Sequence, residues 1–107
     1  LHHASFELRG IDEYMRGTGR MLRAGVEKIW GPGRHQAGNN TFSYFTTPSG
    51  FAVEYTAELE EVDFETHEPT VHEPGPQVMD QWGVGSGGPQ TMPKPAADPC
   101  LFQSAEV

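Results

Sequence analysis

The chain has 107 residues, 36% of them hydrophobic, with seven Lys and Arg against fifteen Asp and Glu. This length suits one domain with a modest core. The net charge of −8 would repel nucleic acids and anionic membranes, and no apolar run approaches the ~20 residues that cross a bilayer. The single cysteine, Cys100, excludes an intramolecular disulfide and has no partner for a structural zinc site. We therefore expect a cytoplasmic protein that binds neither nucleic acid nor membrane. Because the sequence starts at Leu1 rather than Met, we expect it to begin inside a longer protein.

Residues 1–8, LHHASFEL, alternate between two kinds of side chain. One set is Ala4, Phe6 and Leu8, and the other is His3, Ser5 and Glu7. Neighbours on a strand point to opposite faces, so this pattern predicts a strand.

Residues 11–25, IDEYMRGTGRMLRAG, carry larger side chains at spacings of three and four. These are Ile11, Tyr14, Met15, Thr18, Met21 and Leu22. The spacing predicts a helix that starts near Asp12 and stops at Gly25. Gly17 and Gly19 each cost this helix roughly 1 kcal/mol relative to Ala.

Three further strands are predicted over residues 26–30, 40–45 and 51–59, joined by turns rich in Gly, Pro, Asn and Ser. The resulting order, β-α-β-β-β, predicts an α+β fold in which one helix covers one face of a four-stranded mixed sheet. In the last strand, one set of side chains is expected to face the helix: Phe51, Val53, Tyr55, Ala57 and Leu59. By the same alternation Glu54 points to the open face, together with His3 of the first strand.

The chain is expected to divide into this module, residues 1–62, and a Pro- and Gly-rich tail, residues 63–107, because seven of the nine prolines follow Asp63. The acidic run from residue 54 to 73 is typical of a solvated face or linker. The tail is predicted to be extended and partly docked through its apolar residues. These are Val78, Met79, Trp82, Val84, Leu101 and Phe102.

His3 and Glu54 become candidate metal ligands only through their expected meeting on the open face. Taken singly, a histidine or a glutamate on a strand is usually an ordinary surface or core residue. Neighbouring His2 adds nothing to this inference, because it points to the other face.

The run GRHQAGNNTFSYFTTPSGFAVE, residues 33–54, resembles the signature of extradiol ring-cleavage dioxygenases. The matching positions are His35, Tyr44, Pro48, Gly50 and Glu54. The opening strand is similar to the one that carries an iron-binding histidine in that family, which falls on His3. Together, about the first 60 residues look like one βαβββ module of the vicinal oxygen chelate superfamily, which also holds glyoxalases and bleomycin-resistance proteins. Departures from the signature are Ser43, in place of an apolar residue, and Gly38 and Asn39, where some members have an Asp.

This resemblance implies that the chain is the C-terminal part of an Fe(II)-dependent dioxygenase that cleaves a catechol-type ring with O2. His3 and Glu54 would be two metal ligands of a two-histidine, one-carboxylate set, with Mn(II) as the other candidate metal. His35 would be the acid/base residue, since an imidazole gains and loses its proton near neutral pH, and Tyr44 would donate a hydrogen bond to a substrate oxygen.

The third ligand of this set is not found in the chain, because the spacing of His67 and His72 gives no firm metal geometry. The site would be completed by a preceding module or a second subunit, in a homo-oligomer, and the fragment alone is expected to be inactive. Two alternatives stay open: a metal-free small-ligand-binding module of the bleomycin-resistance type, and a glyoxalase-like isomerase.

Overall fold

A computed structural model describes residues 1–94 of the chain. The elements follow in the order β1 (His3–Glu7), α1 (Ile11–Arg23), β2 (Lys28–Arg34), β3 (Thr41–Thr46), β4 (Ala52–Ala57), α2 (Pro76–Met79), β5 (Ser86–Gly87) and a 3-10 turn (Pro89–Thr91). The α+β class and the βαβββ order are therefore confirmed. Within the described part, no helix is long and apolar enough to cross a bilayer.

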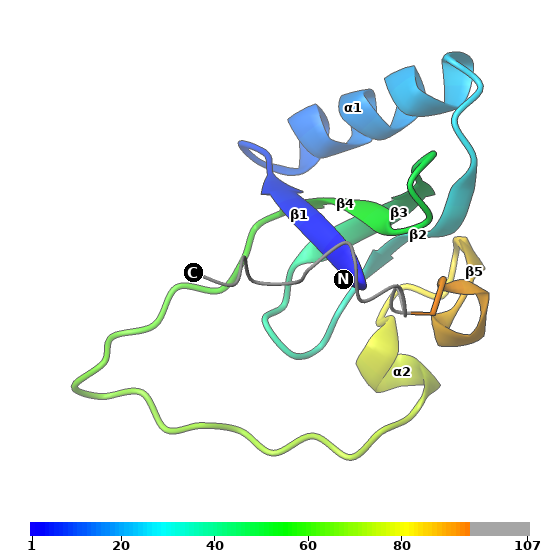
Figure 1. The fold of residues 1–107 in the computed structure, drawn as a ribbon. Helices are drawn as coiled ribbons and strands as arrows, with labels where there is room; N and C mark the ends of the chain where they lie inside the picture. Colours follow the sequence, from blue (N-terminus) through cyan, green and yellow to red (C-terminus); the bar gives the residue numbers. More distant parts are fainter. Residues whose placement is uncertain (95–107) are drawn as a thin grey trace, which may run out of the picture.

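The sheet has the strand order β1-β4-β3-β2-β5, and α1 lies over one of its faces (Figure 1). β1 runs parallel to β4, and the other neighbours are antiparallel, so the sheet is mixed as expected. The number of strands was underestimated, because β5 adds a fifth strand through Ser86 and Gly87 on the outer edge of β2. A two-residue strand in a glycine-rich segment has no hydrophobic alternation from which it could be predicted.

α1 packs on the sheet through one aromatic and two small residues. Tyr14, Gly17 and Thr18 are buried, and a Cβ added to Gly17 would lie 3.2 Å from the Tyr55 ring. The Tyr14 hydroxyl donates to the Phe42 carbonyl of β3 and contacts Ser43 Oγ at 2.8 Å. Ser43 therefore faces the helix, where its hydroxyl pairs with that of Tyr14.

The set of helix residues expected to pack on the sheet was too large, because the side chains of Ile11, Met15 and Leu22 remain between 42 and 47% exposed. The helix also ends at Arg23 rather than Gly25, and its N-cap is Gly10, without a side-chain cap. α1 thus presents a partly apolar surface away from the sheet.

The open face of the sheet carries its own aromatic cluster, formed by Trp30, Phe42 and Tyr44 with Ala52. Ile29 and Met92 pack against this cluster. β4 ends at Ala57 because Glu58 takes a positive φ of 58°. The expected alternation therefore does not extend to Leu59, which is 50% exposed.

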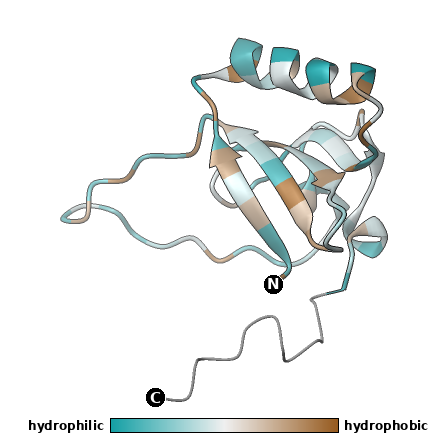
Figure 2. Cartoon of the chain, turned by 45° about the horizontal axis from the view of Figure 1, so that its top comes forward, coloured by the Kyte–Doolittle hydropathy of each residue, from teal (hydrophilic) through white to brown (hydrophobic). Residues whose placement is uncertain are grey.

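The segment after β4 first leaves the sheet and then returns to it (Figure 2). Residues 76–91 return along β2: Gln81 N donates to Arg34 O at 2.6 Å, and the Arg34 guanidinium lies 5.2 Å from the Trp82 ring centroid. Met79 is 36% exposed. The expected anchors Leu101 and Phe102, and also Cys100, lie outside the described residues. The division into 1–62 and 63–107 stays a prediction.

Candidate metal and acid–base site

A row of side chains crosses four strands on the face opposite α1. Strand register pairs Ser5 with Glu54, Glu54 with Tyr44, and Tyr44 with Trp30. Because paired residues of neighbouring strands point to the same face, these four side chains stand side by side. Glu54 occupies the second place in the row and is only 5% exposed.

The buried Glu54 carboxylate faces two imidazoles. His3 Nε2 lies 3.5 Å from its Oε1, and His35 Nε2 lies 3.7 Å from its Oε2. The Ser5 hydroxyl donates a hydrogen bond to Oε1. The structure thus brings His3 and His35 to the Glu54 carboxylate, although the three residues come from β1, from the position just after β2 and from β4.

Burial by itself raises the pKa of the Glu54 carboxyl. Polar contacts with its neighbours, His35 first and then Ser5, outweigh burial and bring the pKa below its ordinary value. The Glu54 carboxylate is therefore ionised at neutral pH, which is the form that can bind a metal ion.

His35 is held in one tautomer by its two ring contacts. Its Nδ1 lies 2.7 Å from the Met79 carbonyl, which can only accept, so Nδ1 carries the proton. Its Nε2 lies 3.1 Å from the Tyr44 hydroxyl, which donates to it when the ring is neutral. The ring also stacks on Phe42 with centroids 4.0 Å apart. His35 therefore presents a lone pair toward Tyr44 and Glu54.

Tyr44 stays protonated at this position. Burial first, and then the charge of Glu54, raise its pKa above the ordinary tyrosine value. Its ring stacks on Trp30 at 5.3 Å and meets the His3 ring edge-on at 5.2 Å. The hydroxyl is thus fixed as a hydrogen-bond donor.

His3 has a partner for its second ring nitrogen, because its Nδ1 lies 2.7 Å from His2 Nδ1. Ligand histidines usually have such a partner. Two donors bound 2.0–2.2 Å from one metal ion in adjacent positions lie about 3 Å apart, and the 3.5 Å between His3 Nε2 and Glu54 Oε1 is close to that spacing. His3 and Glu54 therefore fit two positions of an imidazole–carboxylate metal set.

Within residues 1–94, no group of three or more His, Cys, Asp or Glu side chains is arranged to hold a metal ion. His67 lies exposed and His72 half-buried in the segment after β4, and neither joins the site. The described residues supply only part of a ligand set.

Sequence reasoning missed Ser5, Trp30 and Phe42 as members of this site. Ser5 could have been found, because it alternates in phase with His3. The Met79 carbonyl could not, since a backbone contact 44 residues away leaves no trace in a local pattern.

A cleft of about 730 Å³ opens between α2, the Trp82 turn and β5. Of the four side chains that form the row across the sheet, only Trp30 lines this cleft.

The βαβββ order and the His3–Glu54 pair on the open face fit the vicinal oxygen chelate superfamily, which the first 60 residues resemble. The relatives and structural neighbours of this chain are extradiol catechol dioxygenases and glyoxalase-like proteins of that class, which confirms the resemblance drawn from residues 33–54.

Metapyrocatechase 2 of Cupriavidus necator is 32% identical over 82 residues, which cover 77% of this chain and 26% of that protein. The Mn(II)-bound glyoxalase of Novosphingobium aromaticivorans superposes with a TM-score of 0.87 at 60% identity, over 97% of this chain and 35% of that one. A 2,3-dioxygenase from a Pseudomonas species gives a TM-score of 0.59 at 28% identity, over 64% of this chain and 24% of that one.

The chain thus spans about a quarter to a third of the length of the proteins it matches. No protein-family model matches it. The neighbours support a metal cofactor, since one of them is described as Mn(II)-bound.

Proposed function

We propose that this chain is the C-terminal part of an extradiol dioxygenase that uses Fe(II), or Mn(II), to cleave a catechol-type ring with O2. The observation that carries the proposal is the buried, ionised Glu54 carboxylate between His3 Nε2 and His35 Nε2 on the open face. A buried charge of this kind costs free energy unless it is paired or binds a metal. The remaining ligand would come from a preceding module or from a second subunit.

His3 and Glu54 would hold the metal ion. When bound, the metal would act as a Lewis acid that holds both catechol oxygens and brings O2 to the ring. The single negative charge of Glu54 offsets only part of the metal's positive charge. A negatively charged catecholate can therefore still bind without giving the site a large net charge. Its Ser5 hydrogen bond fixes the direction of Oε1.

His35 would be the base that takes a proton from a catechol hydroxyl. Its Nε2 is unprotonated in the neutral ring because Nδ1–H donates to the Met79 carbonyl. The imidazole can later return that proton from Nε2 to an oxygen of the opened ring.

Tyr44 would donate a hydrogen bond to a substrate oxygen on which negative charge develops. Its raised pKa keeps the proton on the hydroxyl during that step. The same hydroxyl lies 3.1 Å from His35 Nε2, so the proposed hydrogen-bond donor and the proposed base are adjacent.

A second candidate is a metal-dependent isomerase of the glyoxalase type. It is favoured by one observation, the 60% identity with a structure described as a Mn(II)-bound glyoxalase. Such an isomerase consumes no O2, and this separates the two candidates.

The test is an oxygen-electrode assay of the protein, together with its preceding module, loaded anaerobically with Fe(II) or Mn(II). With a catechol, the dioxygenase proposal expects one O2 consumed per yellow ring-opened product, and loss of both signals in Glu54→Gln. Glu27→Gln, an exposed glutamate outside the site, is the matched control. Isomerisation without O2 uptake would establish the glyoxalase candidate. Ligand binding without turnover in the metal-loaded protein would establish a binding module, and either result would reject the dioxygenase.

A further inference from the structure

The segment between β4 and α2, residues 58–75, extends away from the body of the module, and we call it the arm (Figures 1 and 2). At its base, Glu60 N donates to Gly38 O at 2.8 Å. Further out, a local turn forms at Asp63, whose backbone carbonyl accepts from Thr66 N and His67 N. Loops longer than about 12–15 residues without secondary structure are uncommon in compact domains and are either functional or linker segments. The arm is therefore a linker or a functional segment.

The outer part of the arm combines exposed apolar and acidic side chains. Phe64 is 97% exposed and Val71 is 91% exposed. Seven of the fifteen acidic residues of the chain lie in the arm, which contains no Lys or Arg. They are Glu58, Glu60, Glu61, Asp63, Glu65, Glu68 and Glu73. A single exposed apolar residue is common on a monomer, but the outer arm holds two that are more than 90% exposed, among many carboxylates. This combination favours a contact segment over a linker.

The outer surface of α1 has the complementary character. Its exposed apolar residues, Ile11, Met15 and Leu22, recur at spacings of four and seven, so they form one stripe along the helix. A second stripe is basic and consists of Arg16, Arg20 and Arg23, of which Arg16 also pairs with Asp12 of the same helix at 2.9 Å. Four of the seven basic residues of the chain lie between Arg9 and Arg23. Figure 2 shows hydrophobic and hydrophilic residues together on α1.

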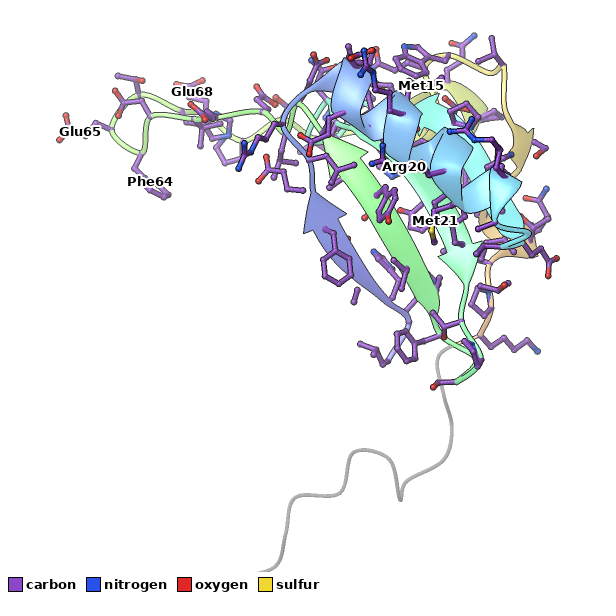
Figure 3. The ribbon with its side chains drawn as sticks, turned by 90° about the horizontal axis from the view of Figure 1, so that it is seen from above. Met15, Arg20, Met21, Phe64, Glu65 and Glu68 are labelled. Atoms are coloured by element: carbon purple, nitrogen blue, oxygen red, sulfur yellow. The ribbon has the colours of Figure 1, made fainter. Side chains whose placement is uncertain are left out.

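Figure 3 shows these two surfaces in one view, with Met15 and Arg20 on α1 and with Phe64, Glu65 and Glu68 on the arm. The arm projects sideways past the body of the module and does not fold back over α1 (Figures 1 and 3). The acidic, apolar surface and the basic, apolar surface of one copy are thus separate.

We propose that the arm of one copy packs on the outer face of α1 of a second copy, and that the second arm does the same in return. Phe64 and Val71 would cover the apolar stripe of α1, and Glu65 and Glu68 would face its arginines. A two-fold pair uses each contact twice, which is the commonest geometry of homodimers. Nucleic acids and anionic membranes do not fit the arm, because its seven carboxylates would repel them. This pairing is independent of the proposed metal chemistry.

The test is a charge exchange followed by sedimentation velocity and native mass spectrometry. One variant reverses the arm (Glu65→Arg with Glu68→Arg), and the other reverses the helix (Arg16→Glu with Arg20→Glu). Each variant alone should weaken self-association at least tenfold, because both contacts of its homodimer then bring like charges together. Mixed in equal amounts, the two variants should form a heterodimer of wild-type affinity, since arm and helix are matched again at both contacts.

Two further measurements complete the experiment. Phe64→Ser should weaken the dimer by about tenfold or more, as expected for loss of a buried aromatic contact, and added salt should weaken the wild-type dimer. Glu27→Arg, outside both surfaces, is the control, and circular dichroism reports whether each variant is folded. A monomeric wild type, a dimer insensitive to either reversal, or a mixture that fails to form the heterodimer would overturn the proposal.

Discussion

Replacing His35 by Gln separates proton transfer from hydrogen bonding at this site. In the wild type, Nδ1–H donates to the Met79 carbonyl at 2.7 Å, and Nε2 accepts from the Tyr44 hydroxyl at 3.1 Å. The amide of Gln is near in length and can keep one donor and one acceptor, but it cannot take up a proton at neutral pH. The variant therefore removes the proposed base and leaves His3 and Glu54 in place.

The expected loss of rate is larger than any structural effect of the substitution. A general base contributes about 10²–10⁴-fold, which corresponds to roughly 2.7–5.4 kcal/mol of activation free energy at 1.36 kcal/mol per tenfold. Loss of the stacking on Phe42, with centroids 4.0 Å apart, costs about 0.5–1.5 kcal/mol of stability. A domain of ordinary stability remains folded after such a loss, so kcat should fall while metal content stays near one per site.

The assay measures kcat, metal content and the pH profile of His35→Gln in the protein that includes the preceding module. The variant should turn over at least about 10²-fold more slowly, and the contribution of the His35 imidazole to the pH profile of the wild type should be missing. Gln36→Ala, an exposed neighbour, should behave as wild type. An unchanged kcat in His35→Gln, or a loss explained wholly by missing metal, would refute the role given to His35.

Three further predictions concern the module and its stability. Gly19→Ala should raise the free energy of unfolding by about 0.5–1 kcal/mol, because the added Cβ would meet only the flexible end of Arg23, at 3.1 Å. Gly17→Ala should be at least about 1 kcal/mol less stable than Gly19→Ala, because its Cβ would lie 3.2 Å from the packed Tyr55 ring. Equal urea stabilities of the two variants would contradict this packing. Tyr14→Phe should lower the free energy of unfolding by about 1–2 kcal/mol at neutral pH. Burial raises the pKa of the Tyr14 hydroxyl. The stabilisation by the protonated hydroxyl is therefore fully present below the ordinary pKa of about 10 and is lost as the pH rises through the folded-state pKa. Urea unfolding should therefore show a smaller alkaline loss in Tyr14→Phe, the remainder belonging to Tyr44, and an identical loss would be inconsistent with that burial. The chain expressed alone should bind Fe(II) weakly and form no ring-opened product from a catechol, and turnover equal to that of the longer protein would disprove the incomplete ligand set.

Much of the module could be predicted because its sequence has clear local periods. Alternation placed His3 and Glu54 on the face opposite the helix, and the spacing between residues 11 and 25 predicted α1 to within two residues of its C-terminal end. The turn between β3 and β4 was placed correctly, but the Gly–Pro–Gly run at 31–33, expected in a turn, belongs to β2, which continues to Arg34. These are local signals, and each depends on neighbours along the chain.

The rest depends on pairing between distant segments, which a local pattern does not record. The register that aligns Ser5 with Glu54 and Tyr44 with Trp30 arises from packing across the sheet. The same holds for β5 and for the Met79 carbonyl that fixes the tautomer of His35. Exposed Phe64 carried no such signal either, because a hydrophobic residue in an acidic run does not reveal whether it is buried.

The metal content of Glu54→Ala tests the central claim most directly, namely that His3 and Glu54 bind one metal ion. The variant and wild type would be purified anaerobically with the preceding module, loaded with Fe(II), dialysed, and analysed for iron by elemental mass spectrometry, with Glu27→Ala as control. The account predicts about one iron per site in wild type and control and almost none in Glu54→Ala, because the remaining donors cannot hold Fe(II) against water. Stoichiometric iron in Glu54→Ala would contradict it.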